Sequence, residues 1–204
     1  DLLGITYTDF VRTTEPRHAK SVQKFWQDRY DKGWCYKGSY EGWYCVHEET
    51  YYAESDLEKN EEGQLVCPDC KRPVQKAGGE ENWFFKLSEF GDKLLAFYEE
   101  NPDFIRPETR KNEIVSFVKS GLKDLSISRS TFDWGVPLPY DEGHVAYVWA
   151  DALLAYLTGI GYGDEGERAG EFERRWPMQY HFVGKDTTRF HCVIWPAMLM
   201  AAGM

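Results

Sequence analysis

Residues Val145-Ala-Tyr-Val-Trp149 and Tyr180-His-Phe-Val183 decide the predicted fold class. Each is a short, continuous apolar run of strand length. Each is followed by a segment with helical periodicity, from about Asp151 to Thr158 in one case and from about Thr187 to Ala202 in the other. An alternation of strand and helix is typical of a parallel sheet covered by helices. The last third of the chain is therefore predicted to be α/β.

The rest of the chain contains more helices and one segment of a different kind. Helices are predicted over about Pro16–Lys32, Glu89–Glu100 and Pro107–Ser120, because apolar residues recur at helical spacing and proline or glycine marks the ends. Residues 34–87 are rich in tyrosine, tryptophan and glycine but contain few aliphatic side chains. Short strands and tight turns are expected there, held together by something other than a large core.

The composition excludes two classes of protein. Of the 204 residues, 42% are hydrophobic and 28% are charged, and the mean hydropathy is −0.59. No apolar run approaches the roughly 18–20 residues that a membrane helix needs, so a membrane-spanning protein is excluded. The 8 Trp, 13 Tyr and 12 Phe residues provide ample core material, which excludes an intrinsically disordered chain.

The net charge of −10 is concentrated in the middle of the chain, since residues 35–143 carry 13 basic and 22 acidic side chains. Such a segment is a poor phosphate binder by itself. The sequence opens at Asp1, without an initiator methionine, and closes inside the apolar run Trp195–Met204. We therefore expect an internal piece of a longer protein.

The cysteine content favours a reducing, cytoplasmic setting. There are 5 cysteines, an odd number, in a chain large enough to fold without disulfides. Two of them form the turn Cys67-Pro-Asp-Cys70, which resembles half of a tetrahedral zinc site.

The other half of this zinc site would come from the stretch Cys45-Val-His47-Glu48. Three thiolates with either His47 or Glu48 make a chemically reasonable ligand set for zinc. The alternative is a knuckle that has lost its metal. A redox role for the two cysteines of the turn is disfavoured, because no βαβ unit surrounds them.

Two helical faces could line a ligand site at the edge of the predicted sheet, where parallel folds bind ligands. Both faces follow from spacings of three, four, seven or eight residues. Ordinary packing of helix on sheet is the alternative for each residue. The first face carries Trp149, Ala152, Leu153 and Tyr156, and the second carries Thr187, His191 and Trp195.

Gly184-Lys185-Asp186 stands at the predicted junction of a strand and a helix. Glycine allows a close backbone approach there, and a carboxylate at a helix start can bind ribose hydroxyls. Asp186 is equally suited to cap the helix.

Several motifs together resemble the catalytic region of the bacterial-type methionyl-tRNA synthetase family, and the resemblance covers essentially the whole chain. These motifs are Ile5-x-Tyr-x-x-Phe-x-Arg-Thr-Thr14, Tyr36-Lys-Gly-x-Tyr-Glu-Gly-Trp-Tyr-Cys45, Ile127-Ser-Arg129, Tyr147-Val-Trp149-x-Asp151-Ala152-Leu153, Phe182-Val-Gly-Lys-Asp186, Arg189-Phe-His191 and Trp195-Pro-Ala-Met198. The family is class I, with a dinucleotide-binding-type catalytic fold interrupted by a connective insertion that carries zinc knuckles.

The resemblance implies roles for the matching positions. Trp149, Ala152, Leu153, Tyr156, Thr187, His191 and Trp195 are expected to bind the amino acid. Arg129, Gly184 and Asp186 are expected to bind ATP. Cys45, Cys67 and Cys70 fall on zinc-ligand positions, with Glu48 on a fourth position that is usually cysteine and His47 beside it.

The resemblance also implies a domain organisation. Residues 1–34 and 144–204 would be the two parts of a Rossmann-like catalytic domain, and residues 35–143 would be the connective insertion. The His-Ile-Gly-His and Lys-Met-Ser-Lys-Ser signatures of the family do not occur in this sequence. The catalytic residues are therefore expected outside it, and the fragment alone is expected to be inactive.

The expected function is that of a cytoplasmic ligase of protein biosynthesis, with methionine, ATP with Mg²⁺, and tRNA as substrates, and with zinc in the insertion. One alternative is another class I synthetase for an apolar amino acid, which the paired Trp149 and Trp195 disfavour. The other is a non-enzymatic zinc-knuckle module that uses only residues 35–87. That module would leave the two helical faces unexplained.

Overall fold

The computed structural model describes residues 4–48, 50–52 and 54–204, and the chain divides into two compact units. The large unit comprises the described residues up to Tyr36 together with Trp83–Met204. The small unit is Lys37–Asn82. The predicted insertion of residues 35–143 is longer than the small unit, and its bounds along the chain stay a prediction.

Helix α1 (Pro16–Asp31) confirms the first predicted helix. Pro16 occupies the first turn, where a missing N–H breaks no intrahelical bond. The buried face of the helix carries Val22, Phe25 and Trp26, each fully buried. The indole N–H of Trp26 donates to the carbonyl of Ala150 at 2.9 Å, which ties α1 to the segment that carries the first predicted helical face.

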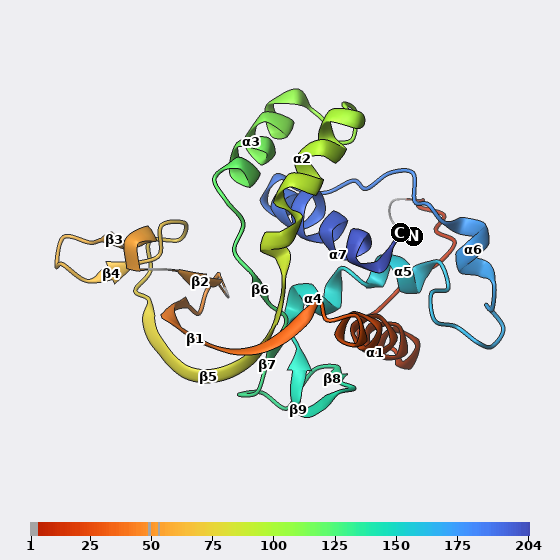
Figure 1. Cartoon of the computed structure of the whole chain (residues 1–204), viewed down its shortest axis with the longest axis horizontal. Helices are drawn as coiled ribbons and strands as arrows, with labels where there is room; N and C mark the ends of the chain where they lie inside the picture. The colour runs from red at the N-terminus through yellow and green to blue at the C-terminus, as the bar shows by residue number, and fades with distance from the viewer. Residues whose placement is uncertain (1–3, 49, 53) are drawn as a thin grey trace. The chain divides into compact units, whose positions relative to one another are not determined.

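Helices α2 (Gly91–Glu100) and α3 (Glu108–Lys119) confirm the next two predicted helices and pack against each other, as Figure 1 shows. A short 3₁₀ turn, η2 (Leu87–Phe90), leads into α2. Leu94 and Tyr98 of α2 and Ile114 and Val118 of α3 are buried. Their i, i+4 spacing puts each pair on one face of its helix.

The strand pairings whose direction is described are all antiparallel, so the predicted parallel sheet is wrong for these elements. In the large unit, β7 (Ser128–Arg129), β9 (Asp141–Ala146) and β8 (Pro137–Leu138) form a three-stranded sheet in that order. Strand β6 (Leu125–Ser126) pairs with the end of β5 (Gln75–Phe85).

The two runs that were expected to be strands behave differently in the structure. The first overlaps only the end of β9, and α4 (Val148–Ala152) begins before the run ends. The second, Tyr180–Val183, is not assigned to a strand, and no described strand pairs with it. Tyr180 is 79% exposed and Phe182 is 95% exposed, so this run lacks the burial that its sequence predicts.

The two helices expected after these runs are present but irregular. The first is divided into α4 and α5 (Ala155–Gly159). Helix α6 (Glu171–Arg175) follows in the connecting segment. The second begins with a 3₁₀ turn, η3 (Lys185–Thr187), continues as the π-helical segment η4 (Phe190–Ile194), and ends as α7 (Trp195–Ala202).

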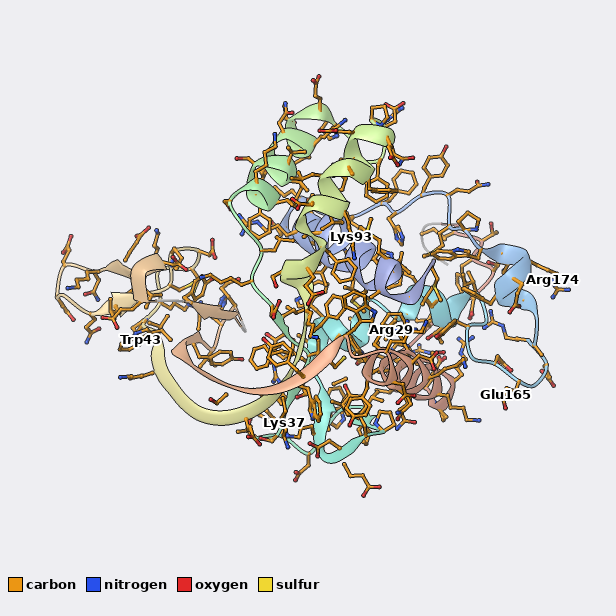
Figure 2. All side chains as sticks on the ribbon, viewed as in Figure 1. Arg29, Lys37, Trp43, Lys93, Glu165 and Arg174 are labelled. Carbon is orange, nitrogen blue, oxygen red and sulfur yellow. The ribbon has the colours of Figure 1, made fainter. Side chains whose placement is uncertain are left out.

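One hydrophobic core joins these helices within the large unit. It includes the buried face of α1, the aliphatic side chains of α4, α5 and α7, and Phe85 and Phe90 from the segment around η2. Figure 2 shows this density of side chains between the helices, whereas Glu165 and Arg174 project from the periphery. None of the helices in the described part of the chain combines the length and the hydrophobicity needed to cross a membrane.

The small unit has a very small core, as its composition predicts, but its strands are not all short, since β1 (Cys35–Cys45) and β5 each have 11 residues and continue beyond the unit along the chain. Strands β1 and β2 (Thr50–Tyr52) pair, and so do β3 (Glu58–Lys59) and β4 (Leu65–Val66), with the 3₁₀ turn η1 (Glu54–Asp56) between these pairs. The buried residues of its core are Cys45, Cys67 and Val74.

Candidate functional site

An aromatic cluster in the large unit brings together four of the predicted amino-acid-binding residues. We define the aromatic cluster as Trp149 of α4, Tyr156 of α5, His181 of the extended run, Phe190 and His191 of η4, and Trp195 of α7. The rings meet face to face or edge to face, and their centroids lie 3.6–6.4 Å apart. Such contacts fix the rings and create a polarizable apolar surface.

His191 is held by hydrogen bonds on both sides of its ring. Nδ1 lies 2.8 Å from the carbonyl oxygen of Thr187, and because a carbonyl can only accept, this nitrogen carries the proton. In the neutral ring Nε2 is then an acceptor, and the Tyr156 hydroxyl donates to it at 2.7 Å. Burial raises the pKa of Tyr156, which keeps this hydroxyl protonated.

Trp195 and His181 form a second polar pair in the cluster. The Trp195 indole N–H donates to Nε2 of His181 at 3.3 Å, and Trp195 itself is only 2% exposed. Although part of the His181 residue is exposed, its ring lies edge-on to Tyr156 at 4.4 Å. Desolvation, followed by the neighbouring His191, lowers the pKa of His181 and favours the neutral ring that this hydrogen bond needs.

Phe190 stacks on Trp149 with ring centroids 3.6 Å apart and an interplanar angle of 12°. Phe190 and His181 are not among the site residues that the sequence predicts. Phe190 directly precedes His191, so helical spacing places it on a different face of the predicted helix. His181 lies in the run predicted to be a strand, where helical spacing does not apply.

The remaining predicted amino-acid-binding residues have different surroundings. Leu153 is 1% exposed and belongs to the core. Ala152 is half-buried at the end of α4. Thr187 supports the cluster through its carbonyl, which accepts from His191, while its hydroxyl donates to the carbonyl of Gly184 at 3.0 Å. All three assignments stay predictions.

A buried histidine fixes the helices that carry Trp149 and Tyr156. Nε2 of His18, from α1, lies 2.6 Å from a carboxylate oxygen of Asp151 in α4. Its Nδ1 lies 3.0 Å from the hydroxyl of Thr158 in α5. His18 is fully buried, so its contact with Thr158 is shielded from water, whereas the Asp151 carboxylate is partly exposed. One side chain thus connects α1 to both short helices.

The predicted ATP-binding residues lie at the start of η3 and in the three-stranded sheet. Arg129 ends β7, and its guanidinium lies 4.7 Å from the ring centroid of Tyr147 and 5.1 Å from that of Phe132. Gly184 and Asp186 are exposed at the 3₁₀ turn η3. A Cβ at Gly184 would meet no heavy atom within 4 Å, so space alone does not require glycine there.

The small unit brings the three predicted cysteine ligands together. The sulfur atoms of Cys45, Cys67 and Cys70 all lie within 4.8 Å of one another, and those of Cys45 and Cys70 are 3.5 Å apart. Tetrahedral zinc with Zn–S bonds of about 2.3 Å separates its sulfur ligands by about 3.8 Å. The thiol spacing therefore fits a zinc ion.

The fourth ligand position has two candidates in contact with each other. Nδ1 of His47 lies 2.9 Å from a carboxylate oxygen of Glu48, and these two with Cys70 form a second group of potential metal ligands. The main-chain N–H of Glu48 donates to the sulfur of Cys45 at 3.5 Å. Burial raises the pKa of the Cys67 thiol, but hydrogen bonds led by the main chain at Cys70 outweigh it and lower the pKa overall.

The turn that presents Cys67 and Cys70 ends on a residue in an unusual conformation. Lys71 has a φ of +59°, in the left-handed region that favours glycine. Its ammonium contacts both carboxylate oxygens of Glu58 at 2.7 Å, and its main-chain N–H donates to the carbonyl of Cys67 at 2.9 Å. These bonds hold the turn in the shape that brings the two sulfurs together.

The family model described as "tRNA synthetases class I (M)" matches residues 1–204. The chain belongs to this class I synthetase family. It is 56% identical over 205 residues to the methionine–tRNA ligase of Streptomyces coelicolor, covering 99% of this chain and 37% of that protein. It is 50% identical over 202 residues to the methionine–tRNA ligase of Thermotoga maritima, covering 99% of this chain and 31% of that protein.

Solved structures of the family share the fold. The model matches a crystal structure of Mycobacterium tuberculosis methionyl-tRNA synthetase bound by methionyl-adenylate, with a TM-score of 0.91 and 45% identity, over 99% of this chain and 39% of that one. The free state of that synthetase matches with a TM-score of 0.86 and 46% identity, over 99% of this chain and 40% of that one.

These comparisons confirm the family resemblance and the fold class expected from the sequence, a class I synthetase catalytic fold of mixed helix and strand. The chain spans about a third of the length of the curated relatives it matches, from 30% to 38%.

Proposed function

We propose that these residues are part of the catalytic region of a methionine–tRNA ligase. In the proposed reaction, a carboxylate oxygen of methionine attacks the α-phosphate of ATP, so that methionyl-adenylate forms and pyrophosphate leaves. A terminal ribose hydroxyl of tRNA then attacks the activated carbonyl, and AMP leaves. No side chain forms a bond to the substrate, so the protein acts by positioning and by charge stabilisation.

The aromatic cluster is the observation that carries this proposal. The side chain of methionine is unbranched and ends in a polarizable thioether, which gains from contact with aromatic rings. The cluster presents such rings from five segments of the large unit. A site for a branched aliphatic side chain gains less from an arrangement of this kind.

The pair of Tyr156 and His191 supplies the polar part of the proposed methionine site. The Tyr156 hydroxyl donates a hydrogen bond to His191, so its oxygen keeps the capacity to accept another hydrogen bond. A thioether is only a weak acceptor, and selectivity for methionine must therefore rest on shape, ring contact and few polar groups. Both ring nitrogens of His191 are already engaged, which holds the pair in place.

We assign Arg129, Gly184 and Asp186 to the proposed ATP site. Asp186 offers a carboxylate for ribose hydroxyls, and Gly184 allows a close approach of the backbone. Arg129 offers a guanidinium for an anionic group. Mg²⁺ would accompany the ATP phosphates as the counter-charge.

We assign a structural zinc ion to Cys45, Cys67 and Cys70, with His47 or Glu48 as the fourth ligand. The spacing of the three sulfurs supports this assignment, because the thiols lie close enough to share one ion. When bound, zinc would act as a cross-link in a unit whose hydrophobic cluster, among the described side chains, contains three buried residues. This chemistry is structural and belongs to the small unit alone.

The five cysteines all occur as free thiols, which supports a reducing compartment, and we propose the cytoplasm. Two other functions are less well supported. The identity to methionine–tRNA ligases argues against a class I synthetase of another specificity. A zinc-knuckle module without enzymatic activity would leave the aromatic cluster without a role.

Methionine-dependent exchange of pyrophosphate into ATP, measured on the full-length protein, tests the proposal. We expect exchange with methionine and none with isoleucine, valine or leucine at the same concentration. Exchange that depends on one of those amino acids, or no exchange at all, would contradict it.

A further inference from the structure

We infer that Tyr98 of helix α2 is a positioning residue for methionine recognition, because its hydroxyl donates to the carbonyl of Cys192, whose α-helical donor position is occupied by Pro196. This inference rests on the proposed function. It concerns a residue outside the aromatic cluster, on a helix from the middle of the chain that the sequence reading did not connect to the site.

Pro196 creates the need for an external donor. In a regular α-helix, the carbonyl of residue 192 accepts from the main-chain N–H of residue 196. Residue 196 is proline, which has no N–H. The carbonyl of Cys192 therefore loses its regular donor inside a mostly apolar core, and an unsatisfied carbonyl in such a place is destabilising.

The hydroxyl of Tyr98 supplies the missing hydrogen bond by donating to the carbonyl oxygen of Cys192. Tyr98 is only 2% exposed, and burial raises the pKa of its hydroxyl, so the group stays protonated and able to donate. Its ring stacks on that of Phe104, at a centroid distance of 6.1 Å. The donor is thus fixed in position.

The segment that Tyr98 supports carries the central groups of the aromatic cluster. Phe190 and His191 belong to η4, where the main-chain N–H of Trp195 donates to the carbonyl of Phe190 in the wider π register. π-Helical segments of this kind are rare and frequently occur at functional sites. The register decides which way His191 points, and hence whether its Nε2 meets the Tyr156 hydroxyl.

A second contact ties the same helix pair to the start of η4. The guanidinium of Arg189 lies 4.6 Å from the ring centroid of Phe117 in α3. Helices α2 and α3 therefore contact the chain on both sides of His191, at Arg189 and at Cys192. This gives the helix pair a way to act on the site without touching the substrate.

The test compares four variants of the full-length protein in the methionine-dependent exchange assay: Tyr98→Phe, Pro196→Ala, the double variant and, as a matched control, Tyr36→Phe. The control loses the bond from the Tyr36 hydroxyl to Asp124, which is 2.9 Å long and involves no residue of the aromatic cluster. We expect Tyr98→Phe to raise the KM for methionine by about two- to tenfold, as for one lost hydrogen bond, with kcat and the KM for ATP unchanged.

Pro196→Ala provides the rescue, because alanine restores an N–H that can reach the carbonyl of Cys192. We expect Tyr98→Phe to raise the KM for methionine less in the Pro196→Ala background than in the wild type. The inference is overturned if Tyr98→Phe behaves like Tyr36→Phe. Equal weakening of methionine and ATP binding, or an effect of Tyr98→Phe that is the same in both backgrounds, also overturns it.

Urea unfolding of the same variants separates this inference from the proposed function. If the wild type shows no methionine-dependent exchange, the proposed function fails. The hydrogen bond from Tyr98 to Cys192 is then tested by the urea midpoints alone. We expect Tyr98→Phe to lower the midpoint of unfolding less in the Pro196→Ala background than in the wild type. Equal lowering in both backgrounds would overturn the role of Tyr98 independently of any activity.

Discussion

His191 shows how the hydrogen bonds of a side chain can depend on neighbours that are distant in sequence. Its tautomer follows from the Thr187 carbonyl four residues earlier, and its acceptor nitrogen meets Tyr156, which is 35 residues away. The first contact could be expected from helical spacing. The second depends on how α5 packs against η4, which spacing within one helix does not encode.

Truncation of Trp149 tests the methionine site at the residue scale. Trp149 is half-buried and stacks on Phe190, so Trp149→Ala should remove ring surface without opening the deepest part of the core. A single methylene-sized contact discriminates by about 1–3 kcal/mol, and loss of a whole ring should raise the KM for methionine at least about tenfold. The measurement is a titration of methionine and of ATP in the exchange assay.

Arg129→Lys is the companion variant for that titration. It keeps the positive charge but loses the planar guanidinium group with its paired N–H donors. It should therefore raise the KM for ATP more than the KM for methionine. A thermal melt of both variants runs alongside. If Trp149→Ala weakens both substrates equally, in proportion to its loss of stability, then Trp149 packs the core and does not line the site.

The pH dependence of methionine binding tests the pair of His181 and Trp195. Desolvation and the neighbouring His191 lower the pKa of His181, so the folded state favours the neutral ring, whose Nε2 accepts from Trp195. This favourable contribution is complete above the ordinary histidine pKa of about 6.5 and is lost as the pH falls through the lower pKa of the folded state.

The KM for methionine should therefore rise as the pH is lowered from 7.5 to 5.5 at roughly constant ionic strength, over the range in which His181 takes up a proton. His181→Gln keeps an acceptor for the indole N–H but does not titrate. It should show a flatter profile. Identical profiles for the wild type and His181→Gln would assign the pH dependence to another group.

At the scale of elements, the sequence predicted helices better than strands. The boundaries of α1, α2 and α3 follow from apolar periodicity and from Pro16, Pro102 and Gly121, all local signals. A strand depends on a partner, and an apolar run alone does not specify one. The run at 180–183 has no partner among the described strands, and that at 145–149 is divided between β9 and α4.

The small unit shows the same contrast between local and distant signals. The turn from Cys67 to Cys70 is recognisable from the sequence. The resemblance to a zinc knuckle predicts that Cys45 lies close to these two cysteines. The left-handed Lys71 and its contact with Glu58 were not foreseen, because lysine carries no conformational preference that marks such a position. Backbone shape there is set by the contacts of the turn.

Replacement of Cys67 tests the cross-link at the element scale. The wild-type protein, prepared without chelators, should hold about one equivalent of zinc in the small unit, and Cys67→Ser should release it. Hydrogen exchange should then accelerate in residues 37–82 more than in the large unit, because three buried residues are a small core for this segment. Cys192→Ser, which changes a cysteine of the large unit, is the matched control.

Measurement of the zinc content decides whether these cysteines hold a zinc ion. Zinc-free wild-type protein with slow exchange in residues 37–82 would mean that the unit is a metal-free knuckle. Full retention of zinc in Cys67→Ser would place the ion elsewhere. The variants His47→Ala and Glu48→Gln identify the fourth ligand, because the variant that lacks this ligand should have the lower zinc content.

The chain contains the aromatic cluster and the three neighbouring thiols of Cys45, Cys67 and Cys70. It spans only 30–38% of the length of its curated relatives. The sequence includes neither of the family's phosphate-binding signatures. We therefore expect binding of the amino acid and activation of its carboxylate to be separable. Under the proposed function, the first draws on residues in the large unit, and the second requires groups that bind the ATP phosphates.

We accordingly predict that the 204-residue chain by itself forms no methionyl-adenylate, whereas the full-length protein does. Catalysis of adenylate formation depends on charge stabilisation around the transferred phosphoryl group, and removal of such groups typically costs several orders of magnitude in rate. The measurement is methionine-dependent pyrophosphate exchange, with both proteins at equal concentration. Circular dichroism confirms that the shorter chain retains its helices, so that inactivity is not mistaken for unfolding. Exchange by the folded 204-residue chain at a rate near that of the full-length protein would place the phosphate-binding groups within these residues, with the basic side chains Arg129 and Lys185 as the first to replace.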